Sequence, residues 1–182
     1  EVLPPSQCNY IMGNPPFVGY SLQSKEQEAD MLDIYVDEKG KSYKTAGKID
    51  YVAGWYFKAA EYIQNTGVRT AFVSTNSITQ GEQVAAVWKP LYDRFGIHID
   101  FAWRTFIWNS ESNEKAHVHC VIIGFSCSDN NHMKNLYELS SPKMVKDINP
   151  YLVEGKPVFI EARRKPICDV PVFVRGSQPT DD

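Results

Sequence analysis

Two consecutive prolines, placed directly after a short apolar segment, constrain the fold of this chain more than any other feature. Residues 8–12 are mostly apolar, and Asn14-Pro15-Pro16-Phe17 follows them. Proline fixes φ and has no N–H, and the residue before a proline is pushed out of the α region. A buried strand over residues 9–13 should therefore end in a rigid, extended turn with free carbonyl oxygens. Asn14 adds an amide oxygen and Phe17 a flat apolar face, which together suit a planar group bearing an amino group, such as adenine.

Strand-like and helix-like patterns alternate along the next hundred residues. Apolar residues at helical spacing predict a helix over residues 52–63, with Asp50 as its N-cap, and a second helix from about Glu82. Residues 21–36 are polar and mostly helical, and the lysine-rich stretch 39–48 is typical of an exposed loop. Short apolar runs predict further strands over residues 70–74, 97–101 and 118–125.

This order of elements predicts an open α/β sheet. The last two strands are joined by a loop from 104 to 115 with no helix in it, so we expect them to pair antiparallel. Ligands of such sheets bind beyond the carboxyl ends of the strands. Asn14 and Asn76 each follow a strand, so both should lie at that edge.

The composition changes after about residue 126. A polar stretch is followed by segments separated by prolines, and only residues 158–160 and 171–174 are typical of strands. We therefore divide the chain into a sheet domain, residues 1–128, and a linker with the start of another domain, residues 129–182.

Charge, hydropathy and cysteine spacing exclude several classes of protein. The formal net charge of −3 gives no overall attraction to nucleic acid, so a DNA-binding role must rest on local chemistry. No apolar run reaches the roughly 18 residues of a membrane span. The four cysteines form no C-x-x-C pair, and His117 and His119 have no further ligands nearby, so we expect reduced thiols and no metal site.

Three groups of residues resemble a known family. Asn14-Pro15-Pro16-Phe17 resembles motif IV of amino-group methyltransferases. Residues 50–56 and 74–84 are similar to the MmeI-like (type IIL) bacterial DNA adenine-N6 methyltransferases of restriction-modification systems, as are residues 148–152 and 176–179. The resemblance runs from about residue 9 to residue 182. It implies part of a class I S-adenosylmethionine-dependent, Rossmann-like methyltransferase sheet, followed by an irregular β-containing tail that leads into a target-recognition domain.

The resemblance also implies a mechanism and its residues. The target adenine is flipped out of double-stranded DNA, and its N6 hydrogens are accepted by Asn14 and the Pro15 carbonyl while the base stacks on Phe17. Asn14 also touches S-adenosylmethionine. Phe125 aligns with a second aromatic wall, with an ordinary core phenylalanine as an equal alternative. Candidate DNA contacts, for which helix-start or solvated-loop roles stay open, are Asn76, Gln80, Arg104 and Trp108.

In the family, the cofactor-binding motifs precede the catalytic tetrapeptide, whereas this chain begins near it. We therefore expect the missing N-terminal half of the same cytoplasmic, bacterial polypeptide to be a partner, and the chain alone to be inactive. No cysteine follows a proline, which argues against cytosine-C5 methylation, and Phe17 in the fourth place favours adenine over cytosine N4. An RNA guanine-N2 or protein-glutamine methyltransferase and a non-catalytic DNA-binding subunit remain as alternatives.

Overall fold

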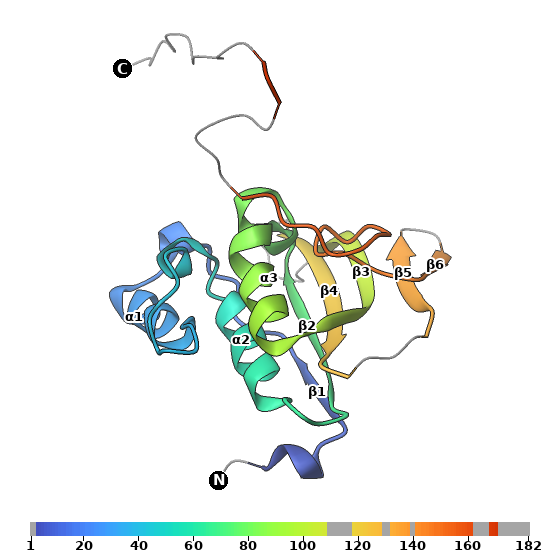
Figure 1. The fold of residues 1–182 in the computed structure, drawn as a ribbon, viewed down its shortest axis with the longest axis horizontal. Coiled ribbons are helices and arrows are strands. Elements are labelled where there is room, and N and C mark those ends of the chain that lie inside the picture. The colour runs from blue at the N-terminus through green and yellow to red at the C-terminus, as the bar shows by residue number, and fades with distance from the viewer. Residues whose placement is uncertain (1–2, 109–117, 129–131, 139–140, 162–167, 171–182) are drawn as a thin grey trace, which may run out of the picture.

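Six strands form one mixed sheet in the computed structural model, which describes residues 3–108, 118–128, 132–138, 141–161 and 168–170 (Figure 1). The spatial order is β1-β2-β4-β3-β5-β6. β1 is parallel to β2 and β3 to β5, whereas β4 and β6 run antiparallel to their neighbours. The carboxyl ends of β1, β2, β3 and β5 therefore share one edge, called here the carboxyl edge. The strand bounds are β1 Tyr10–Gly13, β2 Arg69–Thr75, β3 His98–Trp108, β4 Val118–Ser126, β5 Lys134–Glu138 and β6 Ser141–Val145.

Helices α2, Ala53–Tyr62, and α3, Gly81–Phe95, cover one face of the sheet, and α1, Lys25–Ile34, lies beside them (Figure 1). The buried ring of Tyr56 stacks on Phe125 at a centroid distance of 5.4 Å and meets Trp88 edge-on at 5.3 Å. Such aromatic pairs add about 0.5–1.5 kcal/mol beyond their buried area. The core therefore lies between α2, α3 and the centre of the sheet. Among the described residues, no helix is long and apolar enough to cross a membrane.

Local sequence signals account for the ends of two helices. α1 begins with a capping box in which the side chains and backbone of Ser24 and Gln27 bond reciprocally. α3 ends at Gly96, whose φ of 62° lies in the left-handed region that glycine tolerates. The predicted open α/β fold and the helices over both predicted segments are confirmed.

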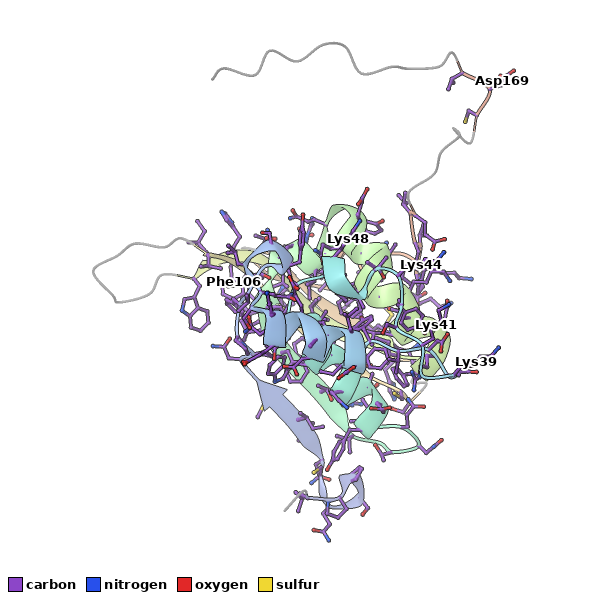
Figure 2. All side chains as sticks on the ribbon, turned by 90° about the vertical axis from the view of Figure 1, so that its left-hand side faces the viewer. Lys39, Lys41, Lys44, Lys48, Phe106 and Asp169 are labelled. Carbon is purple, nitrogen blue, oxygen red and sulfur yellow. The ribbon has the colours of Figure 1, made fainter. Side chains whose placement is uncertain are left out.

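The lysine-rich loop that follows α1 is largely exposed, as its composition predicts, although Ala46 within it is fully buried. The Asp37 carboxylate accepts bonds from the backbone N–H groups of Lys39 and Lys41, which closes a tight turn. Those hydrogen bonds hold the pKa of Asp37 below its usual range. Figure 2 shows Lys39, Lys41, Lys44 and Lys48 along the outer side of the molecule, and a short 3₁₀ turn, Ala46–Lys48, leads on to α2.

Strand β1 is less buried than its sequence predicts. Tyr10 is 69% exposed and Met12 is 83% exposed. β1 is the end strand of the described sheet, and α2 and α3 cover only the opposite face, so the face that carries Tyr10 and Met12 meets no described helix. The prediction of a strand is confirmed, and the prediction that it is buried is wrong for these two side chains.

The second half of the chain departs further from expectation. β3 continues through Trp108, where a loop was expected from residue 104, and two irregularities in its pairing with β4 let it bend. β5 and β6 extend the same sheet, although neither was predicted. Residues 158–160 form no strand, and the strand expected over 171–174 lies outside the described residues. The division at residues 128 and 129 stays a prediction.

Candidate functional site

The Asn-Pro-Pro-Phe turn leaves the sheet at the carboxyl edge, directly after β1. Gly13 pairs with Phe72, and an added Cβ at Gly13 would lie 3.2 Å from the Phe72 ring, so the small residue allows this close approach. Asn14 is exposed, Pro15 is buried and Phe17 is half-buried. No described residue donates a hydrogen bond to the Asn14 side chain or the Pro15 carbonyl. These two acceptors therefore have no donor among the described residues, and the two prolines restrict the backbone that carries them.

The loop after β2 lies at the same edge, because β1 and β2 are parallel neighbours. It forms a 3₁₀ turn, Asn76–Thr79, in which Asn76 is half-buried and Ile78 is fully buried. The indole N–H of Trp88 donates to the Ile78 carbonyl at 2.8 Å, and the Thr79 hydroxyl donates to the Asn76 carbonyl at 2.7 Å. Asn76 is therefore held in place by its own turn and by α3.

Asp50 is not the N-cap that the sequence suggests. α2 begins at Ala53, and its cap residue, Val52, makes no side-chain capping bond. The Asp50 carboxylate, 6% exposed, instead accepts hydrogen bonds from the Tyr20 backbone N–H at 3.1 Å, the Ser77 hydroxyl, and the Gln83 amide at 3.5 Å. These donors come from the segment after β1, the loop after β2 and the first turn of α3.

Backbone contacts support the same junction. The Tyr51 N–H donates to the Val18 carbonyl at 2.9 Å, immediately after the Asn-Pro-Pro-Phe turn. Gln23 donates to the Ile49 carbonyl at 2.9 Å, and Gln83 donates to the Lys48 carbonyl at 3.1 Å. Residues 48–51 therefore bind both the segment after β1 and the start of α3. No local pattern indicated this junction, because its partners lie far apart in sequence.

Phe125 does not lie at the candidate site. Its side chain is fully buried and packs on Tyr56 and Phe72. β4 is antiparallel, and Phe125 pairs with Thr70 near the start of β2, at the opposite end of the strands from Asn14. A core ring cannot stack on an extruded base, so the suggested aromatic wall is corrected to the alternative of an ordinary core phenylalanine.

The remaining candidates lie on the surface. Gln80 is exposed at the N-cap position of α3 and makes no capping bond with its side chain. Arg104 forms an exposed ion pair with Glu138 at 2.6 Å. Trp108 ends β3, which runs parallel to β2, so it lies at the carboxyl edge, where it is 45% exposed.

Sequence reasoning missed a second aromatic side chain near Trp108. Phe106, labelled in Figure 2, is half-buried, and its ring centroid lies 6.4 Å from that of Trp108. The alternation of side chains along a strand places residues 106 and 108 on the same face. Phe17, Phe106 and Trp108 are therefore three aromatic residues that the structure places near the carboxyl edge.

An open α/β sheet with an Asn-Pro-Pro-Phe turn at its carboxyl edge has the architecture of a methyltransferase domain. A family model described as "MmeI, DNA-methyltransferase domain" matches residues 1–138. The chain belongs to this family of DNA-methyltransferase domains, as the sequence resemblance indicated.

Two relatives agree with this assignment. A Bacillus subtilis (strain 168) protein named DNA methyltransferase A is 41% identical over 172 residues, which cover 94% of this chain and 19% of the relative. The solved structure of the type IIL restriction-modification enzyme MmeI in complex with DNA is 47% identical, with a TM-score of 0.84, over 93% of this chain and 23% of that one. The chain thus spans less than a quarter of either relative.

Proposed function

We propose that this chain is part of a site-specific DNA methyltransferase that moves a methyl group to N6 of a flipped adenine in a restriction-modification enzyme. The observation that carries the proposal is the turn after β1, which presents the exposed Asn14 amide beside Phe17 in a chain of this family. The solved relative was studied in complex with DNA, which supports double-stranded DNA as the substrate here.

The two acceptors of the turn suit the chemistry of an aromatic amine. The lone pair on adenine N6 is conjugated with the ring, which makes the nitrogen a poor nucleophile. If the Asn14 side-chain oxygen and the Pro15 carbonyl each accept one N6 hydrogen, the nitrogen becomes more tetrahedral and its lone pair becomes available. Two prolines hold these acceptors in place before the base arrives, so little reorganisation is needed at the moment of reaction.

Phe17 supplies the surface for the extruded base. Flipping costs a few kcal/mol, and stacking on an aromatic side chain returns roughly 1–3 kcal/mol per base. Phe17 is half-buried, so one part of the ring is held by the protein while another part stays accessible.

The described residues fit only part of a site for S-adenosylmethionine, which would supply an electrophilic methyl group. We propose that Asn14 contacts the donor, but the 182 residues contain no G-x-G sequence of the kind that cradles a nucleotide cofactor. We therefore propose that the cofactor is bound mainly by residues of the parent enzyme outside this chain, and that the chain alone is inactive. Isothermal titration calorimetry of the chain should detect no binding, and micromolar affinity would contradict this expectation.

DNA contacts are proposed at the loops of the carboxyl edge. Asn76 and Gln80 lie on the strand-to-helix loop after β2, and Trp108 lies at the end of β3. Arg104 already pairs with Glu138, so it would have to exchange this exposed partner for a phosphate. Exposed ion pairs are worth only about 0–1 kcal/mol, so this exchange costs little.

The proposal is tested by methyl transfer with the full-length enzyme that contains this chain, offered duplex DNA, RNA and protein in separate assays. Transfer to adenine N6 of DNA is expected, and transfer only to RNA or protein would contradict the proposal. Asn14→Ala should lower kcat by about 10²–10³-fold, the usual cost of one preorganised polar contact to the reacting group. Asn135→Ala, an exposed asparagine on β5, is the matched control and should leave kcat unchanged.

The stacking role of Phe17 has a separate readout. With 2-aminopurine in place of the target adenine, base flipping raises its fluorescence because the base leaves the stack. Phe17→Ala should weaken binding of the flipped state by about 10-fold or more, whereas Phe17→Tyr should keep it. A non-catalytic DNA-binding parent would show binding without methyl transfer to any substrate.

A further inference from the structure

Two loops that flank the candidate site are bound to one buried carboxylate, that of Asp50. On the basis of the function proposed above, we infer that Asp50 is a positioning residue for methyl transfer. It holds the segment after the Asn-Pro-Pro-Phe turn and the loop after β2 in a single arrangement. Asp50 lies in neither loop, and the side chains and backbone groups that donate to its carboxylate belong to Tyr20, Ser77 and Gln83, not to Asn14 or Asn76.

Both oxygens of the carboxylate are used. Oδ1 accepts from the Tyr20 backbone N–H at 3.1 Å and from Gln83 Nε2 at 3.5 Å, and Oδ2 accepts from the Ser77 hydroxyl. The Asp50 N–H in turn donates to Gln83 Oε1 at 3.3 Å, and the Ser77 and Thr75 hydroxyls lie 2.9 Å apart.

Hydrogen bonds therefore stabilise the buried negative charge of Asp50. In the described part of the chain, no lysine or arginine forms an ion pair with it. A buried carboxylate is costly unless such bonds satisfy it, and bonds to a charged acceptor are about twice as strong as neutral ones. Loss of the carboxylate would release donors on three segments at once.

The route from Asp50 to the reacting groups is short. The turn is fixed on one side by Gly13, which pairs with β2. On the other side, Val18 accepts from the Tyr51 N–H and Tyr20 donates to Asp50, so the turn is held within three residues of Phe17. Gly19 lies against the carboxylate, since an added Cβ would be 3.9 Å from Oδ1. Without Asp50, the carboxyl-terminal side of the turn loses the hydrogen bond between the Tyr20 N–H and the carboxylate.

The same carboxylate fixes the second loop through Ser77, the residue after Asn76. The two loops are thus bridged by a side chain that belongs to neither. Misplacement of a reacting group by about 1 Å can cost about 10²-fold in rate, even when the altered residue is remote from the chemistry. Asp50 should therefore act on kcat more than on DNA binding.

The test uses three variants of the full-length enzyme. Asp50→Ala should lower kcat by about 10²-fold with little change in KM for DNA. Asp50→Asn keeps the Oδ1 acceptor for the Tyr20 N–H. Its amide N–H can donate to the Ser77 hydroxyl when that hydroxyl donates to Thr75. Asp50→Asn should therefore have most of the wild-type kcat that Asp50→Ala loses. Asn149→Ala is the matched control. Asn149 is 8% exposed, and its side-chain oxygen accepts hydrogen bonds from the backbone N–H groups of Tyr151 at 3.0 Å and Val153 at 3.4 Å. It should lose stability but keep kcat.

Hydrogen exchange gives an independent readout of position. Peptides covering residues 14–24 should exchange faster in Asp50→Ala than in the wild type, and should be unchanged in Asn149→Ala. If Asp50→Ala does not fold, Ser77→Ala removes one donor from the network and should lower kcat by a smaller factor, with the buried carboxylate still present.

Several results would overturn the inference. One is a kcat for Asp50→Ala equal to that of Asn149→Ala. A second is a kcat for Asp50→Asn no higher than that of Asp50→Ala. If the Asp50 variants do not fold, the third is an unchanged kcat in Ser77→Ala. An inactive wild-type enzyme would refute the proposed function itself. An active wild type with Asp50 variants of normal kcat would refute only the positioning role.

Discussion

The contact between Gly124 and Phe101 gives a sharp test of the packing between β3 and β4. Gly124 lies on β4, and the Phe101 side chain of β3 lies across it. A Cβ added at Gly124 would be 2.1 Å from Phe101 Cε1 and 2.4 Å from Cδ1. Ordinary contacts between carbon atoms are about 3.5–4.0 Å, so Gly124→Ala must displace the ring by more than about 1 Å.

The cost follows from this displacement. Overpacking a well-packed site costs typically 1–3 kcal/mol, which corresponds to a factor of about 5–150 in an equilibrium constant. We expect Gly124→Ala to raise the hydrogen-exchange rates of β3 and β4 amides by a factor in this range. The measurement is hydrogen exchange with mass spectrometry on peptides covering residues 98–108 and 118–126 of the full-length enzyme.

Two comparisons decide whether the steric argument holds. Gly47→Ala is the control, because a Cβ at Gly47 meets nothing within 4 Å, and it should not change the exchange rates. In a Phe101→Ala background the obstacle is absent, so Gly124→Ala should cost little, and the two substitutions should be non-additive. An equal effect of Gly124→Ala in both backgrounds would refute the reasoning.

Three further predictions concern other contacts. Burial raises the pKa of Asp100, and the nearby Ser126 hydroxyl and the positive charge of Arg69 partly offset this rise. Wild-type stability should therefore fall as pH rises from the ordinary aspartate pKa to the raised one. Asp100→Asn should therefore raise the melting temperature at neutral pH but not at pH values below the ordinary pKa. Trp88→Phe leaves the buried Ile78 carbonyl without its donor, which should cost about 1–3 kcal/mol in thermal unfolding. Arg104→Ala should cost less than about 1 kcal/mol in stability, and should lower the salt slope of DNA binding by about 1 if it contacts a phosphate.

The parts of the fold that depend on local periodicity could be predicted from the sequence. Apolar spacing identified α2, α3 and the first four strands, and the absence of a helix between residues 101 and 118 gave the antiparallel pairing of β3 and β4. The turn at Asn14 was located because prolines restrict the backbone wherever they occur. In each case the residues that determine the local structure lie within a few positions of it in the sequence.

Features that depend on sheet position could not be predicted in this way. Phe125 has the apolar neighbours expected of any strand, and only the antiparallel direction of β4 puts it at the far end from Asn14. Tyr10 and Met12 are exposed because no described helix covers the face of the sheet that carries them, a property of the tertiary arrangement. β5 is polar at both ends, so its short pattern resembles a loop until it pairs with β3.

Asp50 shows why the contact between the two loops at the carboxyl edge depends on tertiary structure. An aspartate a few residues before a helix has two uses for its carboxylate: it can cap the nearby N–H groups, or it can accept bonds from distant donors. Here the Asp50 backbone carbonyl accepts from the Ala53 N–H at 2.9 Å, which starts the helix without a side-chain cap. The carboxylate is thereby free for Tyr20 and Ser77, 30 and 27 residues away in sequence. The two loops at the carboxyl edge are therefore joined by a residue whose local sequence suggests only a helix start, and substitutions there should affect catalysis before they affect the helix.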